Sequence, residues 1–339
     1  MTVSGIGNDS YFRTKKESSF NTAASGGDML VMPVSPDSKM AMKRMQIEND
    51  VQVAARQFQK PNSGRESCQG NMNMDIHPSL IGDILNYAFG ASDNDDDNAD
   101  GTYSHQWIQA LSGEREGTSF TMEQALGADL AERITGCTIH AIHFSGDNEG
   151  NLKVACDVVG KNYTADIVRI VTFIYPSEIP FNFSHVTINV EPTGVSAFDL
   201  DVNSWNLDID LNYDIERFKS GSDSILQPVF NGVPVVNFGC EIDADQKFVD
   251  YARAITPADL TITSTSTEEA SAGGKAWALL VELPSAILSS DTEIPNSGER
   301  MTMTLDFDCR YGGYTTNSPA SNVMFEIGCT DTDSSYLAT

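Results

Sequence analysis

The same series of secondary-structure signals occurs twice in this chain, about 160 residues apart. Its order is strand, loop, strand, helix, strand and hairpin strand. "VQVAARQF", which ends at Phe58, corresponds to "LNYDIERF", which ends at Phe218, and a cysteine precedes each expected helix (Cys68 and Cys240). The repeat favours an internal duplication. The alternative is two unrelated β-rich stretches that share a common motif.

Alternating polarity identifies the expected strands. In "WNLDIDLNYDIERF" (205–218), apolar residues alternate with Asp208, Asp210 and Asp214, which predicts one long strand. Strands are also expected over 45–58 and 68–76, and "SGDNEGN" predicts a hairpin turn within 136–160. Strands with one polar face favour antiparallel sheets that are open on one side. Polar loops are expected at 59–67 and 219–235.

Two short helices are expected. "PSLIGDILNYAFG" places apolar residues on one helical face from Pro78, and Gly90 predicts its end. "ADQKFVDYARAI" predicts the second helix. The fold class is therefore mainly β with short helices, as two tandem β-sandwich or half-barrel modules, each with one flanking helix. The expected divisions are an N-terminal arm and first strand (1–44), two modules (45–165 and 166–315) and a C-terminal strand or tail (316–339).

Composition limits the possible partners. The 339 residues carry a formal net charge of −27, which disfavours tight binding to nucleic acid phosphates. No apolar run is long enough to span a membrane, and the N-terminus lacks the apolar core of an export signal. The first 30 residues are polar and are expected to be an arm outside the core. Six scattered cysteines suggest reduced core thiols of a protein assembled in the cytoplasm.

No motif indicates catalysis, a cofactor or a metal site. His140 and His143 lie three apart in an expected strand, so they should face opposite sides. The acidic run "DNDDDNADG" fits no EF-hand register and is expected to be a solvated loop. A carbohydrate-active enzyme would need two convergent carboxylates, and the sequence selects no such pair.

Several motifs together suggest a family. In order they are "KKESSFNTAAS" (Lys15–Ser25), "MPVSPDSKM", "PSLIGDILNYAFG", "NSWNLDIDLNYDIERF" and "AWALLVELPSAIL". Their order over residues 10–315 resembles that of the major tail tube proteins of long-tailed bacteriophages. Two segments depart from the family pattern, namely the acidic insertion at 93–100 and the tail after Gly313.

The resemblance implies a structural virion protein that self-assembles into stacked rings, a conduit for DNA ejection. Its partners would be its own copies, a tape-measure protein that fills the tube, and the tail terminator and distal tail proteins. DNA would pass without tight binding, and neither a cofactor nor a membrane is implied. The alternatives are another virion β-protein, such as a baseplate-ring or decoration subunit, and less plausibly a carbohydrate-active enzyme.

Combined with the duplication, the resemblance predicts a ring of three chains with pseudo-sixfold symmetry. The acidic face of the expected strand 205–218 supplies lumen-facing candidates: Asp208, Asp210 and Asp214. The two polar loops supply the candidates for contacts between rings: Pro61, Asn62, Arg65, Glu66, Lys219, Asp223 and Gln227.

Overall fold

The computed structural model describes residues 11–24, 29–47, 52–53, 57–58, 62–108, 118–125, 130–168, 175–194, 196–243, 256–271, 274–289, 302–309, 325–334 and 336. The earlier elements are β1 (Tyr11–Lys16), β2 (Leu30–Met32), β3 (Lys39–Ile47), β4 (Gln52–Val53), β5 (Gln57–Phe58), β6 (Asn62–Asp75), α1 (Pro78–Phe89), β7 (Asn94–Asp97), β8 (Tyr103–Ile108), β9 (Phe120–Ala125), β10 (Ala131–Asp147), β11 (Lys153–Gly160) and β12 (Asn162–Thr164). The later ones are η2 (Phe183–His185), β13 (Val186–Pro192), β14 (Phe198–Asp199), β15 (Val202–Asp210), β16 (Val235–Asp243), β17 (Ala258–Glu269), β18 (Ala276–Leu288), β19 (Thr302–Cys309) and β20 (Glu326–Asp331). The fold is mainly β, as predicted, and its strand pairs are antiparallel.

The strands pair in the same order in both halves of the chain. In the first half the order is β2-β1-β9-β10-β11-β6-β3. In the second half it is β14-β13-β17-β18-β19-β16-β15. In both series an antiparallel pair (β3–β6 or β15–β16) comes before three strands that follow one another in the chain (β9, β10 and β11, or β17, β18 and β19). The last of these three strands pairs with the second strand of the antiparallel pair.

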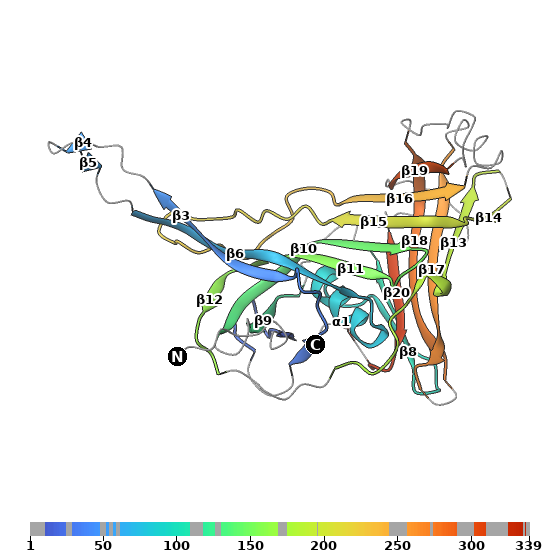
Figure 1. The fold of residues 1–339 in the computed structure, drawn as a ribbon, viewed down its shortest axis with the longest axis horizontal. Helices are drawn as coiled ribbons and strands as arrows, with labels where there is room; N and C mark the ends of the chain where they lie inside the picture. The colour runs from blue at the N-terminus through green and yellow to red at the C-terminus, as the bar shows by residue number, and fades with distance from the viewer. Residues whose placement is uncertain are drawn as a thin grey trace.

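Strand β10 joins the two series within the chain. Its residues 141–147 pair with Ser204–Asp210 of β15, on the edge of β15 away from β16. The result is one continuous sheet, β3-β6-β11-β10-β15-β16-β19, whose strands lie side by side in the upper part of Figure 1. A second group, with β17, β18 and β20, crosses the end of this sheet (Figure 1).

A row of buried residues shows how the continuous sheet forms the core. Paired residues on six neighbouring strands all point inward: Met74, Val154, Phe144, Leu207, Phe238 and Phe307. Each of these side chains is no more than 2% exposed. All six cysteines are buried and free. The alternation that identified the strands thus also assigned the buried face.

Helix α1 lies where the predicted first helix was placed. It begins at Pro78 and ends before Gly90, whose φ of 83° is a conformation that glycine adopts readily. The helix contacts β10, β18, β20 and β8, so both groups of strands cover it. The second predicted helix, at 244–255, lies outside the described residues. Among those described, no helix is long and apolar enough to cross a membrane.

The structure corrects three local predictions. The N-terminal segment is not only an arm, because β1 pairs with β9 and buries Tyr11 and Phe12. The polar loop predicted from residue 59 is strand from Asn62 onward, because its backbone pairs with β3 and needs no apolar side chains to do so. The strand predicted over 205–218 ends at Asp210, after which Asn212 adopts a positive φ of 53°.

The acidic run is exposed at Asn94, Asp96 and Asp97, as predicted, but it forms a strand and not a loop. Residues 94–97 form β7, which pairs with β8 in a hairpin. The side chain of Asp95 is only 6% exposed because it pairs with the buried ring of His105. The sequence indicated the acids of this run but not the distant positive charge that allows one of them to be buried.

Candidate subunit interfaces

The outer face of the continuous sheet is polar and mainly acidic. The central row of residues on this face, in strand order, is Asn73, Ala155, His143, Asp208, Asn237 and Asp308. Asp210 and Asp306 extend the acidic surface in the flanking rows, and both are exposed. Asp208 and Asp210 therefore lie on one solvent-facing surface, as their alternation predicted.

Asp214 lies elsewhere. Because β15 ends at Asp210, Asp214 belongs to the irregular segment 211–234 and is not part of the strand face. Its backbone N–H donates to the carbonyl of Val229, and its carboxylate accepts from the N–H of Glu216 at 3.2 Å. The carboxylate thus stabilises a turn.

His143 provides a positive charge where the two series join. Its Nδ1 lies 2.6 Å from Oδ1 of Asp208 on β15, and its Nε2 lies 3.7 Å from Oδ2 of Asp157 on β11. Interactions with Asp157 and then with Asp208 raise the pKa of His143 to about 9. The ring is therefore charged at neutral pH and links three strands of the acidic face.

His140 does not face away from His143, contrary to the sequence prediction. The register of β10 against β11 shifts between Ile139 and Ala141, which is a β-bulge at His140. The bulge interrupts the alternation of side chains. Burial lowers the pKa of His140, and Asp157, Asp210 and His143 are close enough to influence it. Even so, no group of three or more possible metal ligands occurs within the described residues.

A long two-stranded arm projects from the body (Figure 1). It is formed by β3 and β6, which pair from Lys39↔Asn71 to Ile47↔Asn62. The residues beyond Ile47 include the short pair β4–β5. Along β3, the side chains of Met42, Met45 and Ile47 are 38%, 61% and 53% exposed, so the arm carries exposed apolar surface.

The two predicted contact loops come together on this arm. The N–H of Glu66 donates to the carbonyl of Asp223 at 2.7 Å, and Glu66 forms a parallel bridge with Ser224. The guanidinium of Arg65 lies 4.9 Å from the ring centre of Phe218. Segment 211–234, which holds Lys219 and Gln227, therefore runs beside β6, where Asn62 lies. Pro61 lies outside the described residues.

The charge of the arm differs from that of the body. Residues 39–66 contain six Lys and Arg against three Asp and Glu, a local charge of +3 in a chain of −27. Arg44 on β3 pairs with Glu66 on β6 at 2.5 Å, but it remains 54% exposed. The arm is thus a basic and partly apolar projection from an acidic molecule.

A hollow of about 280 Å³ lies near the first residues of β15, away from the arm. Its acidic lining includes Asp147, Asp201 and Asp243, and its apolar lining includes Phe183, Leu200 and Trp205. Because Asp147 pairs with Ser204 at the start of β15, whereas the arm lies beyond the end of that strand, hollow and arm occupy opposite ends of the molecule (Figure 1). Its volume lies close to the lower limit of the roughly 300–1,000 Å³ of sites for drug-sized ligands.

A family model described as "Phage tail tube protein" matches residues 7–321. No curated protein matches the chain. The family match spans nearly the whole sequence and implies a structural role in the virion tail and self-association into a tube. The chain therefore belongs to the phage tail tube protein family.

Proposed function

We propose that three chains form each ring of the tube and that each ring holds six similar modules. The observation that supports this proposal is the strand order that occurs twice, with β10 of the first series joined to β15 of the second. That joint is a contact between two modules of one chain. The same contact between neighbouring chains would be heterologous, and heterologous contacts either close into rings or continue as filaments. We infer that here the contact closes into a ring of three chains.

The strands that would join neighbouring chains follow from the repeat. Strand β3 corresponds to β15 and pairs only with β6 among the described strands. On its outer edge the backbone of Met40 bonds to the side chain of Gln124, and beyond Met40 no described strand pairs with this edge. Strand β18 corresponds to β10, the strand that β15 meets. We infer that β3 of each chain pairs with β18 of the next, near the end of β18 at Leu288. Pairing of an open edge would also remove an aggregation hazard.

In this ring the polar face with Asp208 and Asp210 lines the lumen. Lys and Arg contacts to phosphates release counterions from DNA and thereby hold it. An acidic wall makes no such contacts, so DNA can slide past it. Replacing Asp306 and Asp308 with Lys tests this role away from the His143 joint. We expect tubes of normal length but lower infectivity, and normal infectivity would contradict a lumen position.

For stacking, the basic arm of one ring enters the acidic hollow of the next. Arm and hollow lie at opposite ends of the molecule, which suits head-to-tail contacts with every ring pointing the same way. The contact would use Arg65, Glu66 and segment 211–234, with Asp223 holding that segment to the arm. Tape-measure, tail terminator and distal tail proteins are proposed partners inside the tube and at its ends, with assembly in the host cytoplasm.

The number of chains per ring decides the main proposal. Purified protein can be imaged as tubes by electron microscopy, and the cross-section averaged. Three copies of the chain with six similar lobes are expected. Six chains per ring would refute the fused-module arrangement, whatever the length of the tubes.

A further inference from the structure

The acidic run and the strand that follows the family match meet in the structure. The acidic run forms β7 of the β7–β8 hairpin, and the family match ends at residue 321, before β20 begins at Glu326. Strand β20 pairs with β8 from Tyr103 to Ile108 on one side and with β18 from Ala278 to Glu282 on the other. Thus β20 covers an edge of β18 that would otherwise be open, which natural sheets generally avoid.

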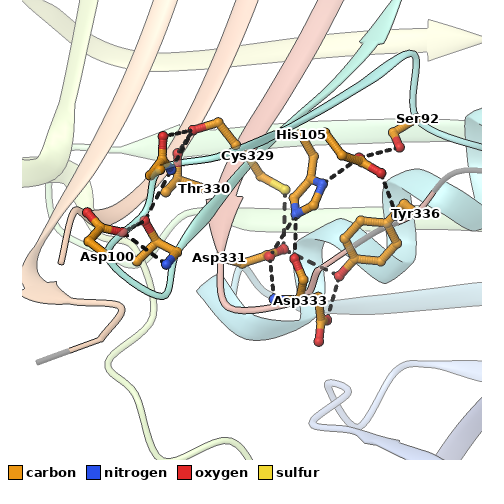
Figure 2. Close-up of polar contacts among 12 residues, drawn as sticks. Ser92, Asp100, His105, Cys329, Thr330, Asp331, Asp333 and Tyr336 are labelled. Atoms are coloured by element: carbon orange, nitrogen blue, oxygen red, sulfur yellow. Dashed lines mark hydrogen bonds and ion pairs between the residues drawn. The ribbon is translucent and has the colours of Figure 1, made fainter.

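A fully buried histidine lies where these segments meet (Figure 2). Nδ1 of His105 is 2.6 Å from Oδ1 of Asp95, and Nε2 is 3.0 Å from Oδ1 of Asp331 and 2.9 Å from the carbonyl of Asp333. Each ring nitrogen faces only hydrogen-bond acceptors. A neutral ring has just one N–H, so with Asp95 and Asp331 ionised both ring nitrogens find partners only when the ring is doubly protonated.

The chain beyond β20 is held by the same cluster (Figure 2). The backbone N–H of Tyr336 donates to Asp95 at 3.2 Å, and its hydroxyl donates to the carboxylate of Asp333 at 2.8 Å. Helix α1 faces this segment through Gly82, where a Cβ atom would lie 2.5 Å from the hydroxyl of Tyr336. The absence of a side chain at Gly82 therefore allows the C-terminal segment to lie against the helix.

We propose that the β7–β8 hairpin and the C-terminal segment, meaning β20 with Asp333 and Tyr336, form a latch that closes the edge of β18 and is held shut by doubly protonated His105. The hairpin supplies the carboxylate of Asp95, and the C-terminal segment supplies the carboxylate of Asp331 and the backbone carbonyl of Asp333. The ring charge compensates the two carboxylates, and removing one partner of a buried ionic network is strongly destabilising.

The charged and titratable groups around the latch set its pH dependence. They are Asp95 on β7, Asp83 on α1, Cys329 and Asp331 on β20, and Asp333 and Tyr336 beyond β20, with Lys16 of β1 acting on Asp83. Burial lowers the pKa of His105, but its hydrogen bonds to Asp331 and Asp95 raise the net value to about 9. Burial, and then the charges of Asp333 and Asp331, raise the pKa of Asp83 to about 7.

Both shifts weaken the latch as the pH rises. A histidine whose folded pKa is raised gives its full stabilisation below its ordinary value of about 6.5 and loses it as the pH passes through the folded value, here about 9. Asp83 has a pKa raised from 3.8 to about 7, so its cost to the closed latch accumulates as the pH rises from about 4 to about 7. The contribution of His105 remains up to about pH 7, and the latch should open above pH 9, where that contribution is lost.

Hydrogen exchange in the full-length chain tests the latch. The variant His105→Gln keeps a polar side chain without the positive charge, and we expect amide exchange over Glu326–Asp331 to become at least tenfold faster at pH 7. The matched control is His143→Gln, which removes another histidine with a pKa raised to about 9 but with no contact to β20. In the control, exchange in β20 should match that of the unaltered protein.

A second measurement applies even if the His105 variant does not fold. In the unaltered chain, protection of β20 relative to β17 should fall as the pH passes through 9, after correction for intrinsic exchange rates. Protection of β20 that is unchanged in His105→Gln, or that follows β17 throughout the pH series, would overturn the latch. Both readouts concern contacts within one chain, so they do not depend on the number of chains in a ring.

Discussion

Strands β3 and β15 hold the same place in the two strand series but differ in their edges. Strand β15 pairs with β16 on one side and β10 on the other, and Leu207 and Ile209 are fully buried. Strand β3 pairs only with β6 among the described strands, and Met42 remains 38% exposed. The difference shows which contact is complete within one chain and which one we expect a second chain to complete.

The largest effect on a single chain is expected at β15. Ile209→Ala removes a fully buried side chain and should lower the free energy of unfolding by about 2–5 kcal/mol. Met42→Ala, the control in the corresponding strand, should change it by less than about 0.5 kcal/mol because the site is partly exposed. Urea denaturation of unassembled protein measures both. Equal losses would mean that the two strands do not differ as described.

The next effect should appear only in assembly. The backbone N–H and carbonyl of Met40 bond to the side chain of Gln124, so they point away from β6, and alternation directs the N–H of Met42 the same way. Met42→Pro would remove an N–H donor from the edge of β3 that has no strand partner. Proline is tolerated at such an edge in the unassembled chain. We expect a folded chain that forms no tubes in electron micrographs. Normal tubes would exclude this edge from the chain-to-chain contact.

A smaller, pH-dependent effect is expected at the β10–β15 joint. The raised pKa of His143 means that its contribution to stability is complete below pH 6.5 and is lost as the pH rises through about 9. The difference in unfolding free energy between the unaltered chain and His143→Gln should therefore shrink between pH 7 and pH 10. Thermal denaturation across this range measures it, and a constant difference would contradict a charged ring at neutral pH.

The smallest effect is expected on the arm. Arg44 pairs with Glu66, but its side chain is 54% exposed, and ion pairs of this kind contribute about 0–1 kcal/mol. Arg44→Ala should barely change the unfolding midpoint, whereas tubes of this variant should dissociate at lower salt concentrations if the arm reaches the acidic hollow. Turbidity or sedimentation in a salt series detects that change. Unaltered salt resistance would indicate that Arg44 is not part of the stacking contact.

The sequence by itself determined the β character of the chain, its first helix and most of its buried faces. These features depend on local patterns: alternation in β15, the apolar face from Pro78 to Gly90, and the turn between β10 and β11. The order of motifs also indicated the family that the comparison confirmed. Such features survive in a single sequence because neighbouring residues create them.

Only the tertiary structure decided where polar segments go. The residues of β6 near Arg65 form a strand because β3 lies beside them, and Asp95 is buried because His105 compensates its charge. His105 in turn needs Asp331, 226 residues away along the chain. No local pattern contains these partners, since backbone pairing and charge compensation join residues that are distant in sequence.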